Sequence, residues 1–248
     1  MDKFFNDISL GLETAFIDRS INSNSFYQPE FLSNNYEQGR KVLVSLEKEL
    51  LNCDEFSISV AFITRSGIEP LLLTLKELEK KNIKGRILTT DYLLFSDPSA
   101  LDKLNELSNI ELKMYKTSCE SGGFHTKGYI FKQDEIYRII IGSSNLTIDA
   151  LTRNREWNTK LVTSSDGAIL HEIKDEFEDL WKHPETKKYS EVAADYRISY
   201  FENKIKILSK LNRNFPDEMH FVPLEKNKFP VSIEQQKRGT CMKFVKCF

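Results

Sequence analysis

The chain has 248 residues, enough for one large domain or for one domain with an appendage. Hydrophobic residues make up 40% and charged residues 29%, a composition typical of a globular protein and not of a disordered one. The formal net charge of -2 excludes a globally basic protein that coats nucleic acid, but it allows a local basic patch that binds phosphate.

The predicted elements begin with two helices, over 1–20 and 36–52, separated by a loop over 22–35 that is rich in Asn and Ser. The second helix has its apolar positions at Val42, Leu43, Leu46, Leu50 and Leu51. From residue 55 strands and helices alternate. We expect strands over 55–63, 85–90, 110–115 and 158–163, and helices over 67–81, 98–107, 166–182 and 190–211. This alternation predicts an α/β domain with a mixed, largely buried sheet flanked by helices on both faces.

Two further strands are predicted in the segment 124–157, which concentrates the polar residues of interest. The first reads F-H-T-K-G-Y-I-F and places His125 and Lys127 on one face, because side chains alternate along a strand. The second strand, over 136–141, leads into G-S-S-N, which contains Ser143, Ser144 and Asn145. Glu156 follows shortly afterwards. We expect these side chains to converge in one cleft.

An imidazole, an ammonium, neutral donors and a carboxylate together suit phosphoryl transfer. A neutral His125 can attack phosphorus, while Lys127, Ser143 and Asn145 neutralise the phosphate oxygens. Glu156 is expected to accept the second imidazole N–H, which would fix the tautomer and raise the pKa of His125. Taken singly, the histidine reads as a packing residue, G-S-S-N as a turn and Glu156 as a solvated carboxylate. Their occurrence together in this order favours a functional site.

The pattern H-T-K followed by G-S-S-N resembles the HxK…GSxN motif of the phospholipase D superfamily, and its spacing resembles the nuclease branch, which includes metal-independent restriction endonucleases. The resemblance implies a phospholipase D-like fold, with His125, Lys127, Asn145 and Glu156 as catalytic residues. It also implies that Ser143 and Ser144 bind substrate, and that no metal or cofactor is needed. The fuller family motif has an aspartate five positions after the lysine, where this chain has Lys132.

The segments S-I-S-V-A-F-I-T-R-S-G-I and G-R-I-L-T-T-D-Y, with the central motif, resemble the amino-terminal domain of bacterial DEAD/DEAH-box helicases. The chain contains no G-x-x-x-x-G-K-[ST] loop for ATP. We therefore expect a phospholipase D-like nuclease domain over 1–184, then a helical extension and tail over 185–248 that leads to an absent helicase motor.

These observations predict a metal-independent phosphodiesterase that cleaves DNA through a phosphohistidine intermediate. The family normally supplies the proton for the leaving oxygen from a second HxK motif. This chain has a single HxK motif, at His125 and Lys127. We therefore expect a two-fold homodimer with two His125 rings facing across one cleft, sealed by apolar residues such as Ile130 or Trp157. Two alternatives stay open: a non-catalytic nucleic-acid-binding module, and a phospholipase or other phosphotransferase.

The compartment is predicted from cysteine usage and from two missing signals. The four cysteines are scattered without a C-x-x-C pair, which indicates reduced thiols and neither a disulfide framework nor a zinc site. The amino terminus lacks a secretory pattern, and no apolar run approaches the roughly 18 residues of a membrane span. We expect a cytoplasmic protein that does not enter a membrane.

Overall fold

The computed structural model describes residues 2–117 and 123–212. The chain divides into two compact units, 1–206 and 207–248, and the first contains the whole sheet. Its elements, in chain order, are α1 (Asp2–Phe16), η1 (Ser25–Tyr27), β1 (Glu30–Leu32), α2 (Val42–Asn52), β2 (Glu55–Val60), α3 (Arg65–Ile68), η2 (Glu69–Leu71), α4 (Leu72–Lys80), β3 (Lys84–Thr90), η3 (Tyr92–Leu94), α5 (Pro98–Asn105), β4 (Ile110–Tyr115), β5 (Lys127–Gln133), β6 (Ile136–Gly142), α6 (Ile148–Thr152), β7 (Asn158–Ser164), α7 (Ala168–Lys182), β8 (Thr186–Lys188) and α8 (Tyr189–Asn212).

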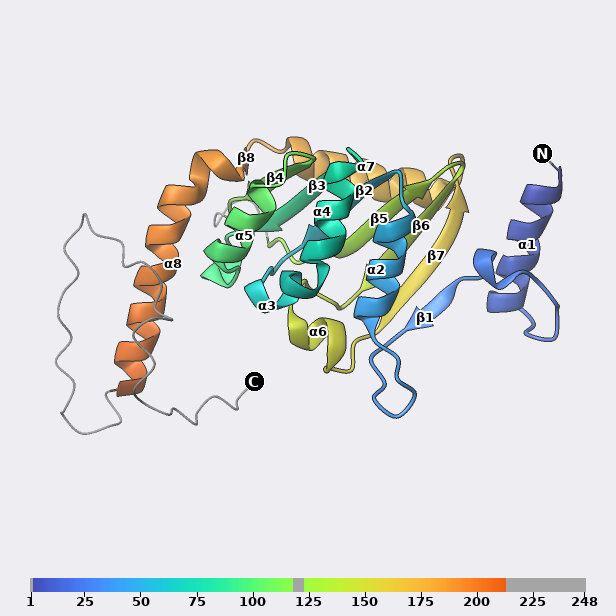
Figure 1. Ribbon diagram of the computed structural model, residues 1–248, viewed down its shortest axis with the longest axis horizontal. Coiled ribbons are helices and arrows are strands. Elements are labelled where there is room, and N and C mark those ends of the chain that lie inside the picture. The colour runs from blue at the N-terminus through green and yellow to red at the C-terminus, as the bar shows by residue number, and fades with distance from the viewer. Residues whose placement is uncertain (1, 118–122, 213–248) are drawn as a thin grey trace. The chain divides into compact units, whose positions relative to one another are not determined.

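Eight strands form one mixed sheet in the order β1-β7-β6-β5-β2-β3-β4-β8. The pairs β2–β3 and β3–β4 are parallel and the others are antiparallel. The helices between the parallel strands cover one face and α7 covers the other (Figure 1). The predicted α/β architecture with helices on both faces is confirmed.

The two faces bury different residues of the same strands. Phe56, Ile58 and Val60 of β2 join the large core under α2, α4 and α5. On the opposite face, Phe177 and Trp181 of α7 pack with Leu88 and Tyr115. The strand β2 was visible in the sequence because apolar and polar residues alternate along E-F-S-I-S-V, and its second face is buried as well, by Ser57 and Ser59.

The short edge strands β1 and β8 were not predicted. β1 lies inside the segment expected to be a loop, where Phe31 pairs with Thr159 of β7. β8 pairs with β4, and Tyr189, Tyr196 and Tyr200 of α8 are buried in the large core. The compact unit therefore continues to Lys206 and past the expected boundary at 184, because a break there would remove an edge strand and three core tyrosines.

A charge cluster on the α2 face, which we name the buried charge cluster, consists of the buried side chains of Glu49, Arg138 and Lys160 together with the partly exposed Glu30. Glu49 of α2 lies 3.5 Å from the Arg138 guanidinium and 3.2 Å from the Lys160 ammonium. Lys160 also reaches Glu30, at 2.8 Å. Two cations thus meet two carboxylates, so the cluster is neutral within itself.

In the part of the chain that the structure describes, no helix is long and apolar enough to span a membrane. The same residues contain no group of three or more His, Cys, Asp or Glu side chains able to hold a metal ion.

Candidate active site

The sheet topology brings the ends of four strands to one edge. β5 and β7 run antiparallel to β2 and β6 respectively, so the starts of β5 and β7 lie beside the ends of β2 and β6. His125 and Lys127 stand at the start of β5, Ser143 and Asn145 follow β6, and Glu156 precedes β7. Residues separated by up to 31 positions in the sequence are therefore neighbours at this edge.

His125 and Lys127 lie in direct contact. The Lys127 Nζ atom lies 2.7 Å from Nδ1 of the imidazole and 3.2 Å from Nε2, and it donates to the His125 carbonyl oxygen at 2.9 Å. Burial lowers the pKa of His125, and the positive charge of Lys127 lowers it further. The neutral imidazole, which is the nucleophilic form, is thereby favoured.

The negative charge of Glu156 acts on Lys127. Burial lowers the pKa of Lys127, and the negative charge of Glu156 partly offsets this effect. The carboxylate accepts a hydrogen bond from the Ser143 hydroxyl, and the Ser143 oxygen in turn accepts the Trp157 N–H at 3.1 Å. Glu156 is thus tied to the strand end that presents Ser143.

The expected pairing of Glu156 with His125 needs correction. Among the described residues the carboxylate bonds to Ser143 and not to the imidazole, and the pKa of His125 is lowered where we expected it to be raised. The reason is that Lys127 occupies the ring nitrogens. A cation beside the ring has the opposite effect to that of a carboxylate.

Asn145 is positioned by the end of β2. Its Oδ1 accepts the Phe62 N–H at 3.1 Å, and the Leu146 N–H next to it donates to the Phe62 carbonyl at 3.1 Å. Gly67 permits α3 to approach this loop, because a Cβ there would lie 2.1 Å from the Leu146 carbonyl oxygen. With its oxygen engaged, Asn145 keeps its amide N–H groups as donors for a ligand.

Ser144 does not fit the expected role in substrate binding. It is fully buried, its hydroxyl accepts from Asn158 at 2.9 Å, and its carbonyl accepts the Tyr129 hydroxyl at 2.8 Å. Alternation along the chain places Ser143 and Asn145 outside and Ser144 inside. Ser144 therefore anchors the loop to the core.

Two aromatic residues next to His125 were not predicted. The rings of Phe62 and Tyr92 lie edge-on to the His125 ring, with centroids 5.9 and 6.4 Å away. Phe62 lies two residues past the end of β2 and packs against the cluster on the α7 face, and the alternation that predicted the strand over 55–63 did not single it out. Tyr92 lies in a turn and carried no sequence signal.

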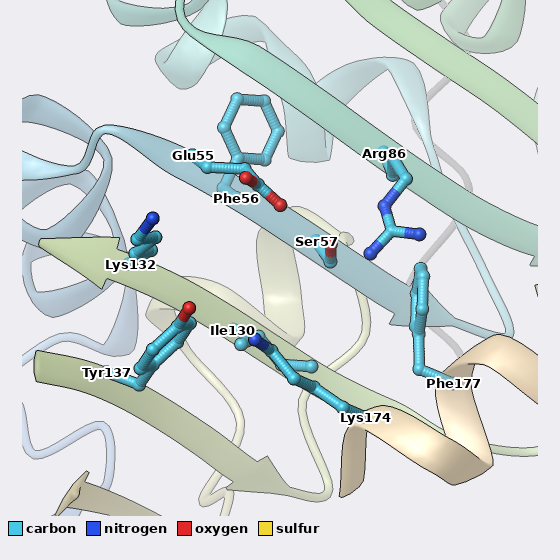
Figure 2. Close-up of a pocket in the computed structure, with 9 residues that line it drawn as sticks. All are labelled: Glu55, Phe56, Ser57, Arg86, Ile130, Lys132, Tyr137, Lys174 and Phe177. Atoms are coloured by element: carbon cyan, nitrogen blue, oxygen red, sulfur yellow. The ribbon is translucent and has the colours of Figure 1, made fainter. Parts of the chain in front are cut away.

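Lys132, which replaces the family's aspartate, lies far from this edge. It is five residues along β5 from Lys127, or about 17 Å. Figure 2 shows it at the rim of a small pocket on the α7 face, with Glu55, Tyr137 and Arg86. The volume of that pocket, about 10 Å³, is too small for more than one water molecule.

Ile130 cannot seal a dimer interface as expected. It is buried beneath α7 with Leu170 and Ile139. Trp157 is 74% exposed, and its ring meets that of the exposed Phe31 at 5.8 Å, so it stays compatible with an interface.

Comparison with known proteins agrees with the fold. Residues 49–181, just over half of the chain, match the family model described as "Cardiolipin synthase, PLD-like domain". No curated protein matches the chain.

Solved structures with a similar fold include two bacterial proteins. NucT from Helicobacter pylori is 18% identical, with a TM-score of 0.50, over 62% of this chain and 96% of that one. Nuc from Salmonella typhimurium, a phospholipase D family member, is 16% identical, with a TM-score of 0.50, over 65% of this chain and 99% of that one. The chain belongs to the PLD-like domain family.

Proposed function

We propose that this protein is a metal-independent phosphodiesterase that cleaves DNA through a phosphohistidine intermediate on His125. The observation that carries the proposal is the contact of His125 with Lys127 at the sheet edge that also presents Ser143, Asn145 and Glu156. A neutral nucleophile, a cation and neutral donors around one point are what an anionic phosphodiester requires.

In the first step, a lone pair of the neutral His125 imidazole forms a bond to phosphorus while the bond from phosphorus to the leaving oxygen breaks. Lys127 and the amide of Asn145 bind the non-bridging oxygens. In the free site Lys127 is held by His125 itself, so the bound phosphate takes over this ammonium and frees the ring. Water then attacks phosphorus as the P–N bond breaks, and the proton that the water loses returns to the acid that protonated the leaving oxygen in the first step.

Ser143 and Glu156 act as a pair in this scheme. The carboxylate accepts a hydrogen bond from the Ser143 hydroxyl, which holds the serine side chain in a defined place beside the phosphate site. Glu156 also keeps a negative charge near Lys127, which counters the effect of burial on the ammonium. We assign Glu156 a positioning role that stabilises Lys127 as a cation.

The leaving oxygen needs a proton, and we propose that a second copy of the chain supplies it. The described residues contain one HxK pair, because neither His171 on α7 nor His183 after α7 has a lysine two positions later. In a two-fold dimer the partner subunit's His125 would face the same phosphate. The negative charge of the bound phosphodiester raises the pKa of that imidazole and makes it an acid.

DNA is the preferred substrate in this proposal because the H-T-K and G-S-S-N motifs resemble the nuclease branch of the superfamily. The segments S-I-S-V-A-F-I-T-R-S-G-I and G-R-I-L-T-T-D-Y resemble the amino-terminal domain of bacterial helicases, so association with a helicase motor forms part of the proposal, and restriction, phage defence and repair all fit it. A phosphatidyl transferase remains the second candidate, because the matching family model carries the description of cardiolipin synthase. Lys132 stands where the family has an aspartate, and it lies about 17 Å along the strand from Lys127, away from the site. The loss of that aspartate therefore gives little support to the alternative of a non-catalytic module.

The test is to incubate the protein with plasmid DNA in excess EDTA. We expect cleavage in EDTA, loss of cleavage in His125→Ala, and a covalent protein–DNA adduct in the wild type alone, trapped by an alkaline denaturing quench because the P–N bond is labile in acid. Cleavage that stops in EDTA and returns with Mg²⁺ would disprove the mechanism. Release of headgroup from phosphatidylglycerol vesicles, without DNA cleavage, would favour the transferase.

The dimer is tested separately by mixing subunits. When wild-type subunits are mixed with an excess of His125→Ala subunits, heterodimers should be inactive. The total activity should therefore fall faster than the fraction of wild-type subunits in the mixture. A fully active monomer in sedimentation experiments would contradict the shared site without contradicting the phosphodiesterase.

A further inference from the structure

Three aromatic rings line one side of His125, and we name Phe62, Tyr92 and Phe95 the aromatic wall. Phe62 is its centre, with centroid distances of 4.9 Å to Phe95 and 6.4 Å to Tyr92. Phe62 and Tyr92 are nearly parallel, with 11° between their planes, and both present edges to the imidazole. The wall therefore begins at the nucleophile.

The wall is open to solvent. Phe95 is 54% exposed and Tyr92 is 37% exposed, and the neighbouring Leu93 is 63% exposed. Exposed large apolar side chains that are scattered singly need no explanation, but a contiguous group beside a phosphate site indicates binding. Its position next to Lys127 and Asn145 specifies a ligand with both an anionic and an apolar, flat part.

The backbone that carries Tyr92 is held in an unfavourable conformation. Leu93 and Leu94 both adopt left-handed φ values, 56° and 49°, which are costly for residues with a branched side chain. The turn is held by the Tyr92 N–H on the Thr90 hydroxyl at 3.1 Å and by the Leu94 N–H on the Asp91 carbonyl at 2.9 Å. Strain of this kind persists when the surrounding structure holds a neighbouring side chain in one place. At this turn the neighbouring side chain is the ring of Tyr92.

A nucleobase fits these properties better than an acyl chain. Bases have flat π-faces, and aromatic side chains bind them by stacking irrespective of sequence. The near-parallel rings of Phe62 and Tyr92 already share the orientation that stacked rings prefer. In an intact duplex the base faces are covered by neighbouring base pairs, so a base reaches the wall only when its strand is unpaired.

We propose that the aromatic wall stacks an unpaired base next to the scissile phosphate, and that the site therefore selects single-stranded DNA over intact duplex. The inference rests on the proposed phosphodiesterase function and deepens it by defining the form of the substrate. Phe62 and Tyr92 are then substrate-binding residues, and the turn at Leu93 and Leu94 positions them.

The experiment measures kcat/KM in EDTA on three labelled substrates: a single-stranded oligonucleotide, its duplex, and the same single strand with abasic positions on both sides of one phosphate. We expect the wild type to prefer the single strand. Tyr92→Ala should lower kcat/KM on the single strand by about 5- to 140-fold, the range for loss of one stacked base. On the abasic strand the wild type and Tyr92→Ala should be equal, because no base remains to be stacked.

Matched variants separate stacking from general damage. Tyr92→Phe keeps the ring and should restore most of the activity, whereas Tyr92→Leu keeps apolar bulk alone and should not. Tyr36→Ala removes a tyrosine that is 98% exposed on the loop between β1 and α2, and it should behave as the wild type. Thermal unfolding of each variant shows whether it is folded.

Two results would overturn the inference while leaving the phosphodiesterase intact: equal cleavage of duplex and single strand by the wild type, or an equal loss for Tyr92→Ala on normal and abasic strands. If no DNA is cleaved, the proposed function fails, and stacking is judged by binding. Fluorescence anisotropy with His125→Ala should show that Tyr92→Ala weakens binding to the normal strand and not to the abasic strand. An effect of Tyr92→Ala confined to phosphatidylglycerol vesicles would overturn the inference in favour of a lipid.

Discussion

The buried charge cluster and the open site around His125 use the same strands, since Arg138 and Lys160 lie within β6 and β7 while Ser143 and Glu156 flank the ends of these strands. In the buried cluster, Arg138 and Lys160 are within 3.5 Å of carboxylates, and all but Glu30 are nearly excluded from solvent. At the sheet edge, Lys127 contacts the imidazole of His125. The charge of Glu156 raises the pKa of Lys127 without a hydrogen bond between the two side chains in the described structure. One set of charges is matched within the protein, while the other leaves its donors for a ligand.

This difference teaches how to distinguish structural from functional charges in a small domain. A buried cation is tolerated when a carboxylate compensates it, and the pair then contributes to the uniqueness of the fold. A cation that contacts a neutral imidazole, beside the amide donors of Asn145, has no such compensation. The predictions below test this separation, beginning with the largest effect.

Glu49→Gln should destabilise the protein by about 3–5 kcal/mol, because it leaves two buried cations with one partly exposed carboxylate. Equilibrium unfolding in urea measures the loss. Activity per folded molecule should be unchanged, since the cluster does not touch His125. Glu30→Gln is the control: Glu30 is 43% exposed, and its loss should cost about 1 kcal/mol or less. A loss for Glu49→Gln no larger than that of the control would show that the cluster is not compensated as described.

The pKa of His125, followed by the NMR shifts of its ring protons, should lie below the ordinary value of 6.5, because burial and Lys127 both lower it. Lys127→Gln should raise it by removing the charge. Activity that needs the neutral ring should therefore persist at pH 6.5 and fall only in more acidic solution. A pKa above 6.5 would mean that Glu156 reaches the imidazole in solution, as the sequence suggested.

The lowered pKa of His125 also makes the stability of the fold depend on pH. Between the folded pKa and 6.5 the unfolded chain binds more protons at this residue than the folded chain does. The contribution of His125 to stability is therefore present above pH 6.5 and is lost as the pH falls through this window.

The smallest effect concerns the strained turn beside the site. Leu93→Gly should stabilise the protein by roughly 0.5–1 kcal/mol, because glycine adopts a left-handed φ without a steric penalty and Leu93 is mostly exposed. Leu73→Gly, at a more exposed position inside α4, should destabilise it by about 1 kcal/mol. Opposite signs in thermal unfolding would support strain at the turn, whereas a loss in both variants would contradict it.

Much of the architecture could be predicted because its signals are local. β6 is an apolar run interrupted by Arg138, β4 alternates apolar residues with Glu111 and Lys113, and α7 has a clear apolar stripe, so both element type and fold class were read correctly. The polar residues of the site stood out because the H-T-K and G-S-S-N motifs are compact. The short edge strands were missed because three residues carry too little pattern to separate a strand from a loop.

The sequence by itself determined the alternation of strands and helices, the face shared by His125 and Lys127, and the order of the motif residues. Only the tertiary structure decided which partner each charge has. The helical pattern of α2 counted Leu51 as apolar core, yet Leu51 is half exposed and Glu49 is buried against Arg138 and Lys160. Glu156 likewise lies on Ser143 and Tyr92 lies beside His125. The physical reason is that an ion pair or a ring contact depends on distances between strands and turns far apart in the chain, which no local periodicity records.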